Sequence, residues 1–108
     1  MLGWRGLILS ACLTAGGCTP REDRSITAID PLNSIPAIQE AAHKKDRSAI
    51  PALIKQLDND DPAIRFYAIS ALQDITGQTF GYHYFDDKPT RKPAIQKWQE
   101  WVGKNMTR

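Results

Sequence analysis

Three side chains that could bind a metal lie close together near the C-terminal end of the sequence. They are His83, Asp86 and Asp87, but their spacing matches neither a zinc motif nor a calcium-binding loop. The other histidine, His43, precedes two lysines near the expected end of a helix, where all three interact favourably with the helix dipole. The sequence has no nucleophile–base pattern and no glycine-rich phosphate loop. It therefore predicts no enzyme, no cofactor and no metal site.

Aromatic side chains gather in the same region and offer binding chemistry instead. Residues 78–89 have the sequence QTFGYHYFDDKP, and Trp98 and Trp101 follow. We favour a structural role, in which Phe80, Tyr84 or Phe85, and Trp98 cap the open end of a helical stack. The alternative is an exposed platform for a peptide or a sugar, since Trp and Tyr offer rigid amphipathic contact area. The candidate interaction surface then comprises Tyr82, His83, Tyr84, Trp101 and Arg65.

The first seventeen residues have the pattern of a secretory signal. Arg5 supplies one positive charge, residues 7–15 are apolar or small, and two glycines precede Cys18. The apolar run is too short to span a bilayer, which needs about 20 residues. We therefore expect a cleaved signal and no membrane-spanning helix in this segment.

Small residues that end at a cysteine resemble the lipobox of bacterial lipoproteins, where signal peptidase cleaves before a cysteine that is lipidated. Cys12 follows Leu-Ser-Ala, the better local box, but too few apolar residues separate it from Arg5. Cys18 follows Ala-Gly-Gly, a weaker box with an adequate apolar run. We expect residues 1–17 to be the signal peptide and Cys18 the lipid attachment site. The alternative is an ordinary secretory signal, which would leave Cys18 as an unpaired thiol in an oxidising compartment.

The lipoprotein resemblance also implies a location in the bacterial cell envelope. In that family, Asp directly after the cysteine favours retention in the inner membrane. Thr19 occupies this position, so the resemblance implies the outer membrane in a Gram-negative cell. Residues 18–33 are mostly polar, contain two prolines and lack a sustained period, which predicts a flexible linker. A docking turn formed by Ile26, Ile29 and Leu32 is the alternative.

From Ser34 onward the apolar residues recur with a helical period. We predict Ser34 and Ser48 as the N-caps of the first two helices. Asp61 followed by proline predicts the start of a third helix, over residues 62–76, and Gly77 its end. Its apolar stripe is Ile64, Tyr67, Ala68, Ala71, Leu72 and Ile75, widened by Phe66 and Ile69. A stripe of this width predicts neighbours on more than one side, as in an α-solenoid.

The segment AIPALIKQLDNDDPAIRFYAISALQDITG, residues 49–77, resembles one HEAT repeat of the short bacterial kind found in phycobilin-lyase-like proteins. The resemblance implies that Arg65, after the turn, bonds to acidic or carbonyl groups of the next turn. IPAIQEAAHKKD resembles the end of a shortened earlier repeat, and KPAIQKWQEWV a Trp-bearing closing helix. We therefore expect residues 34–108 to form an all-α domain. It would be a short α-solenoid of HEAT-like antiparallel helix pairs, capped by the aromatic loop and the C-terminal helix.

Composition and fold together suggest a class of function. A net charge of +2 over 108 residues argues against a nucleic-acid partner. We expect a lipid-anchored envelope protein whose helical domain is a protein–protein interaction module or scaffold. The partner would be another protein, with a homo-oligomer as a further possibility. An envelope binder of small ligands or glycans that uses the aromatic loop is the alternative, and a lyase-like enzyme or enzyme accessory comes third.

Overall fold

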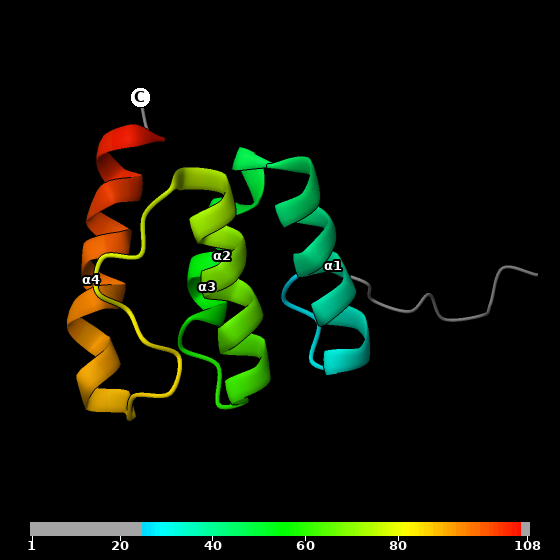
Figure 1. Ribbon diagram of the computed structural model, residues 1–108, viewed down its shortest axis with the longest axis horizontal. Coiled ribbons are helices and arrows are strands. Elements are labelled where there is room, and N and C mark those ends of the chain that lie inside the picture. Colours follow the sequence, from blue (N-terminus) through cyan, green and yellow to red (C-terminus); the bar gives the residue numbers. More distant parts are fainter. Residues whose placement is uncertain (1–24, 107–108) are drawn as a thin grey trace, which may run out of the picture.

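The computed structural model describes residues 25–106, so the signal peptide, Cys12, Cys18 and the start of the expected linker lie outside the described residues. Within this range the chain forms helices and no strand, which confirms the all-α prediction. The elements are α1 (Pro31–Lys44), a 3₁₀ helix (Arg47–Ala49), α2 (Ile50–Gln56), α3 (Pro62–Thr76) and α4 (Lys88–Asn105). Figure 1 shows α1 and α4 at opposite ends of the arrangement, with α2 and α3 between them.

An aspartate fixes the start of each of the three longer helices. Asp30, Asp61 and Asp87 accept hydrogen bonds from backbone N–H groups in the first turns of α1, α3 and α4, at 3.0, 2.9 and 3.0 Å. Each cap is followed by a proline at the first or second helical position, where the missing N–H costs little. The bounds predicted for α3 are confirmed, as is its end at Gly77, which has a φ of 79°.

Two predicted N-caps are wrong. Ser34 lies inside α1 and is buried, because Asp30 starts the helix earlier. Asp46 occupies the position expected for Ser48: it caps the 3₁₀ helix and accepts hydrogen bonds from both the backbone N–H and the hydroxyl of Ser48. In both cases a carboxylate two or more residues upstream satisfies the free N–H groups that a serine was expected to satisfy.

Residues 25–33 do not form a linker, so that part of the prediction is wrong. Ala28 is buried, and the Gln56 side-chain amide donates a hydrogen bond to the carbonyl oxygen of Ile26. Ile26 packs against the core, whereas Ile29 and Leu32 are exposed. The segment before α1 therefore covers the end of α2 and belongs to the folded domain.

The helices pack in a simple pattern around α3. Both α1 and α2 contact α3, and α4 contacts α2. The fully buried large side chains come from all four helices and are Ile38, Ile50, Leu53, Leu57, Ile64, Leu72 and Trp98. Gln73, next to Leu72 on α3, is exposed. The loop of residues 78–87 connects α3 to α4 and carries the aromatic residues singled out in the sequence.

Candidate interaction surface

Buried aromatic side chains hold the loop of residues 78–87 on the helices. Tyr82 is only 4% exposed, and its hydroxyl donates a hydrogen bond to the carbonyl oxygen of Leu57 at 2.7 Å. Phe80 packs edge-to-face on Trp98 with ring centroids 4.7 Å apart. The Trp98 indole N–H donates to the carbonyl oxygen of Thr79 at 3.2 Å. These contacts place the loop as a cover on α2 and α4.

A tight turn orients these rings. Phe80 and Gly81 both have positive φ, 55° and 74°, and the Tyr82 N–H donates to the Thr79 carbonyl oxygen at 3.1 Å. Two successive residues with positive φ are typical of a type I′ turn. The turn allows Phe80 to reach Trp98 and Tyr82 to reach Leu57. Packing of the Phe80 ring offsets the backbone strain of a non-glycine residue in this conformation.

Arg65 is buried and joins the loop to the turn between α2 and α3. Its Nε donates to the carbonyl oxygen of Tyr84 at 2.9 Å. Its Nη1 donates to the carbonyl oxygens of Asn59 and Asp60 at 2.7 and 2.9 Å. The sequence resemblance implied bonds to groups of the next turn, whereas two of the three carbonyl acceptors lie in the turn before α3 and only that of Tyr84 lies after it. Arg65 and Tyr82 are both buried, however, so their placement on an exposed interaction surface was wrong.

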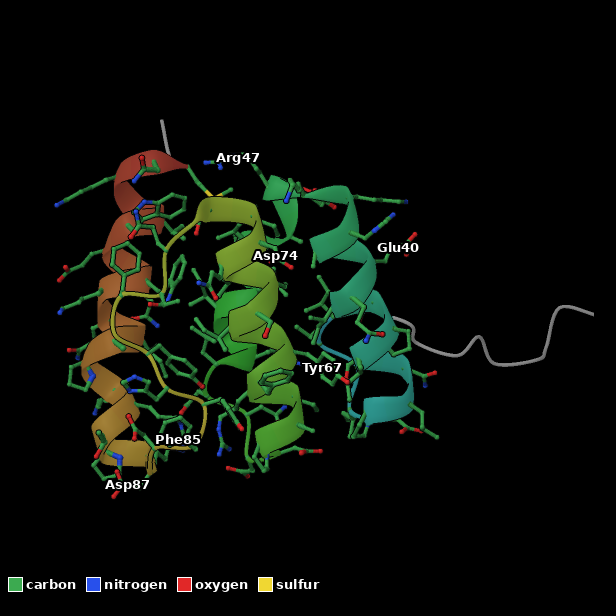
Figure 2. The ribbon with its side chains drawn as sticks, in the orientation of Figure 1. Glu40, Arg47, Tyr67, Asp74, Phe85 and Asp87 are labelled. Atoms are coloured by element: carbon green, nitrogen blue, oxygen red, sulfur yellow. The ribbon has the colours of Figure 1, made fainter. Side chains whose placement is uncertain are left out.

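Five neighbouring aromatic rings form a continuous row on the surface, which we call the aromatic row. Its members, in order of contact, are Tyr67, Phe66, Tyr84, Phe85 and His83, with successive ring centroids 5.3, 5.2, 5.3 and 5.2 Å apart. Phe85 is 68% exposed and Phe66 43% exposed. Figure 2 shows Tyr67 on α3 and Phe85 on the loop. The row therefore brings together side chains from two elements that are separate in sequence.

The predicted surface residues divide between two places. His83 and Tyr84 belong to the aromatic row, but Trp101 does not. The Trp101 ring is half-buried, lies 6.0 Å from the Trp98 ring, and has the Arg47 guanidinium over it at 5.7 Å. Trp98 is fully buried, which agrees with its assignment to the cap, whereas Trp101, assigned to the candidate surface, is the more exposed of the two.

Two exposed members of the row were not on the predicted surface. Phe66 was assigned to the widened stripe of α3, and Phe85 was considered as part of the cap. Phe66 falls off the face of α3 formed by Ile64, Ala68 and Leu72, which was a usable signal of exposure. Phe85 carried no such signal, since loop residues have no fixed period.

Carboxylates lie next to the row in the chain. Asp86 Oδ2 is 3.4 Å from His83 Nδ1. Hydrogen bonds from the Thr90 hydroxyl and backbone N–H hold the pKa of Asp87 below its usual range, so its carboxylate is ionised at neutral pH. The sequence region that carries the exposed rings is thus acidic rather than neutral.

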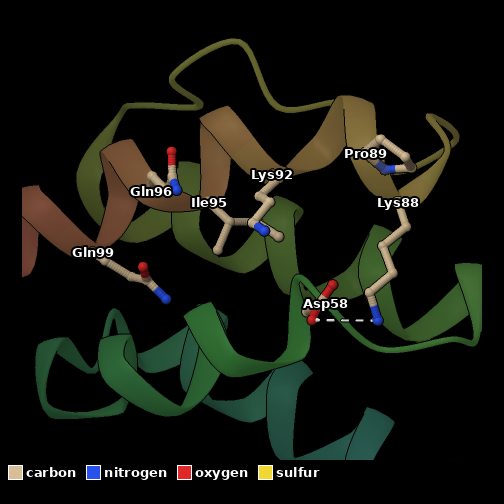
Figure 3. Close-up of a pocket in the computed structure, with 7 residues that line it drawn as sticks. All are labelled: Asp58, Lys88, Pro89, Lys92, Ile95, Gln96 and Gln99. Carbon is tan, nitrogen blue, oxygen red and sulfur yellow. Dashed lines mark ion pairs between the residues drawn. The ribbon is translucent and has the colours of Figure 1, made fainter.

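A groove of about 510 Å³ lies along α4, away from any ring of the row. Figure 3 shows the seven lining residues, which are Asp58, Lys88, Pro89, Lys92, Ile95, Gln96 and Gln99. Lys88 Nζ lies 3.9 Å from a carboxylate oxygen of Asp58. The buried Arg91 guanidinium lies 3.8 Å from the other oxygen and donates to the Asp86 carbonyl oxygen at 2.7 Å. No aromatic ring lines this groove, so it is not the concavity that a sugar-stacking site requires.

Searches for other kinds of site and for similar proteins were negative. Within residues 25–106, no cluster of three or more His, Cys, Asp or Glu side chains is arranged to hold a metal ion. None of the helices in this range has the length and apolar character needed to cross a membrane. A scan of protein-family models and searches of curated proteins and of solved structures gave no match to this chain.

Proposed function

We propose that this chain is a lipid-anchored protein of the bacterial cell envelope whose helical domain is a protein–protein interaction module. The observation that carries the proposal is the aromatic row. Three of its rings, Phe66, His83 and Phe85, are exposed and are joined by the half-buried ring of Tyr84. Exposed apolar groups that lie together commonly mark an interaction site, and aromatic residues are enriched where proteins bind one another. The row also rests on a fixed base, because Tyr82 and Arg65 tie the loop to the helices.

The packing of the helices supports a HEAT-like arrangement. In this proposal α2 and α3 form an antiparallel pair, because only residues 57–61 separate them and the two helices contact each other. The connection ends at Asp61, the N-cap of α3. Contacts of α1 with α3 and of α2 with α4 are those expected when successive helix pairs stack in two layers. In this proposal, α1 is the second helix of a shortened first unit, and α4 is the first helix of an incomplete third unit.

The geometry of the row favours a protein partner over a glycan. The rings of Tyr67 and Phe66, of Phe66 and Tyr84, and of Tyr84 and Phe85 meet at interplanar angles of 73°, 71° and 86°. His83 and Phe85 are closer to parallel, at 29°, but the other three pairs meet edge-to-face and share no flat plane on which successive sugar rings could stack. Their faces and edges instead form an irregular apolar surface, which side chains of another protein can fill.

Photo-crosslinking in intact cells followed by affinity purification tests the interaction. We expect Phe85→Ala to remove at least one specific crosslinked partner, because it deletes the most exposed ring of the row. Leu32→Ala is the matched control, since Leu32 is also an exposed large apolar residue but lies on α1. Equal crosslinking of the same proteins by both variants and by the native chain would contradict the proposal.

Cysteine variants test the lipid anchor. We expect Cys18→Ser to block maturation and to move the protein from the detergent phase to the aqueous phase on phase separation. Lipidation should anchor the native chain firmly, because each buried methylene contributes about 0.8 kcal/mol. Cys12→Ser should leave both behaviours unchanged. The assignment of the lipid site is wrong if Cys12→Ser has these effects instead.

A further inference from the structure

We propose that the aromatic row binds a basic, extended segment of the partner protein, with arginine side chains over its rings. This inference rests on the proposed interaction function and names the chemistry of the partner. Three observations support it. They are the carboxylates that border the row, the contacts that occupy the neighbouring cations, and an arginine that already lies over an aromatic ring elsewhere in the domain.

Acidic side chains border the row on both of the elements that form it. Asp60 and Asp61 precede α3, whose second turn carries Phe66. Asp86 and Asp87 directly follow Phe85. Figure 2 shows Phe85 and Asp87 at the same end of the molecule. Arg65 donates to the carbonyl oxygens of both Asp60 and Tyr84, which places Asp60 near the row. A partner that covers the exposed rings therefore meets carboxylates from both elements.

The cations of this region make their closest contacts with groups other than the border carboxylates, although the charge of Arg91 helps to lower the pKa of Asp87. Arg65 is buried and donates to three backbone carbonyl groups. Lys88 and Arg91 pair with Asp58, which lines the groove along α4. Among residues 25–106, no lysine or arginine lies within ion-pair distance of Asp60, Asp61 or Asp87. These carboxylates therefore have no close ion-pair partner in this part of the chain, and a guanidinium of a partner can approach them.

Arginine suits this combination of groups better than other side chains. A guanidinium can stack on an aromatic face and donate to a carboxylate at the same time. The domain already contains the first of these contacts, since the Arg47 guanidinium lies 5.7 Å from the centroid of the Trp101 ring. An extended segment that alternates arginine with apolar residues would place guanidinium groups over exposed rings and within reach of the border carboxylates, with apolar side chains packed beside them.

Two synthetic peptides of opposite charge provide the test. One contains three repeats of Arg-Leu-Ser, and its twin has glutamate in place of each arginine. Binding to the mature chain is measured by NMR chemical-shift changes at low salt. We expect the arginine peptide to shift the signals of Phe66, Tyr84 and Phe85, and the glutamate peptide to shift none of them. Affinity should fall as ionic strength rises, since salt screens exposed charges.

Matched charge variants test whether the carboxylates at the border bind the peptide, or whether the overall charge of the domain attracts it. Asp61→Asn with Asp87→Asn keeps both N-caps, because Asn caps as well as Asp, and should weaken binding of the arginine peptide about fivefold. Asp30→Asn with Asp46→Asn removes the same charge from two other N-caps and should leave binding unchanged. Phe85→Ala should weaken binding about fivefold through loss of its ring, and Leu32→Ala should not.

Several outcomes would overturn the inference. These are binding of neither peptide, equal binding of both peptides, or equal weakening by the two pairs of aspartate variants. Self-association that Phe85→Ala abolishes would instead make a second copy of this chain the occupant. These results can be told apart from failure of the proposed function. If the proposed function is wrong, Phe85→Ala leaves crosslinking in cells unchanged.

Discussion

At the scale of single residues, Tyr82 shows how a surface prediction can conceal a structural role. It lies among exposed residues, His83 on one side and the exposed Gly81 on the other. Its own side chain is buried, and its hydroxyl satisfies the carbonyl group of Leu57 just beyond the end of α2. A helix end leaves several carbonyl groups without partners. Tyr82 therefore joins a distant loop to a helix C-terminus, which no local sequence pattern reveals.

Replacing Tyr82 tests this role through its dependence on pH. Burial raises the pKa of Tyr82 to about 12, whereas a tyrosine in an unfolded chain has a pKa of about 10. Its contribution to folding is thus complete below pH 10 and is lost as the pH rises towards 12. Tyr82→Phe should lower the free energy of unfolding by about 1 kcal/mol at pH 7. Above pH 10 this difference from the native chain should shrink.

Urea unfolding at a series of pH values measures the effect. Tyr84→Phe is the control, because the Tyr84 hydroxyl makes no hydrogen bond within residues 25–106. That variant should stay within about 0.5 kcal/mol of the native chain at every pH. If the deficit of Tyr82→Phe were the same at pH 7 and at pH 12, the hydroxyl would not be the group responsible.

At the scale of elements, α3 is the helix on which the others depend, because both α1 and α2 pack against it. Leu72 is fully buried there, and Gln73 is exposed one residue later. Leu72→Ala should lower the free energy of unfolding by about 2–5 kcal/mol, through lost burial and the cavity left behind. Gln73→Ala should change it by less than about 0.5 kcal/mol. Thermal unfolding followed by circular dichroism compares them, and similar melting temperatures would contradict this packing.

The bounds of a helix could be predicted where its cap, its proline and its apolar period agreed with one another in the sequence. Asp61, the proline after it, the apolar stripe and Gly77 agree with one another, so α3 was predicted to the residue. The start of α1 was missed because Asp30 lies in a polar, proline-containing stretch typical of a linker. The first turns of α4 were missed because Pro89 and Pro93 obscure the helical period, although Asp87 caps that helix. In both cases an aspartate cap and a following proline were present in the sequence, but the surrounding residues lacked the clear apolar period that supported the same signal at Asp61.

The candidate site shows the same limit. The sequence located the aromatic loop and the order of exposure of Trp98 and Trp101, because spacing along α4 defines a face. It did not predict that Phe66 on α3 would meet Tyr84 in the loop, since that contact joins residues 18 positions apart. Arg65 Nε, bonded to the Tyr84 carbonyl oxygen, sets this alignment, and nothing in the local pattern of either segment specifies it.

At the scale of the whole molecule, both ends of a short helical domain are covered by other parts of the chain. Residues 25–30 cover one end, where Ala28 is buried and Ile26 receives a hydrogen bond from Gln56. The loop of residues 78–87 and α4 cover the other. A short stack of helices exposes core side chains at each end unless something covers them. The cap is therefore part of the core, even though its exposed rings are also the candidate binding surface.

Removing residues 78–108 tests whether the cap is needed for folding. The deletion takes away the fully buried Trp98, whose ring alone buries about 150–250 Å². At about 25 cal/mol per Å² that burial contributes roughly 4–6 kcal/mol, against a total stability of about 5–15 kcal/mol for a typical domain. It also removes the hydrogen bonds that Tyr82 and Tyr84 make with Leu57 and Arg65.

The truncated chain should therefore be a poorly folded remnant, with reduced helical circular dichroism and no cooperative thermal transition. Trp98→Ala in the full chain should lower the free energy of unfolding by about 3–5 kcal/mol, which is a large part of the stability that the truncation removes. Trp101→Ala should cost less, because its ring is only half-buried. A cooperative transition of the truncated chain near the melting temperature of the native protein would contradict this expectation. The loop and α4 would then be an appendage that could serve binding alone, without a part in the core.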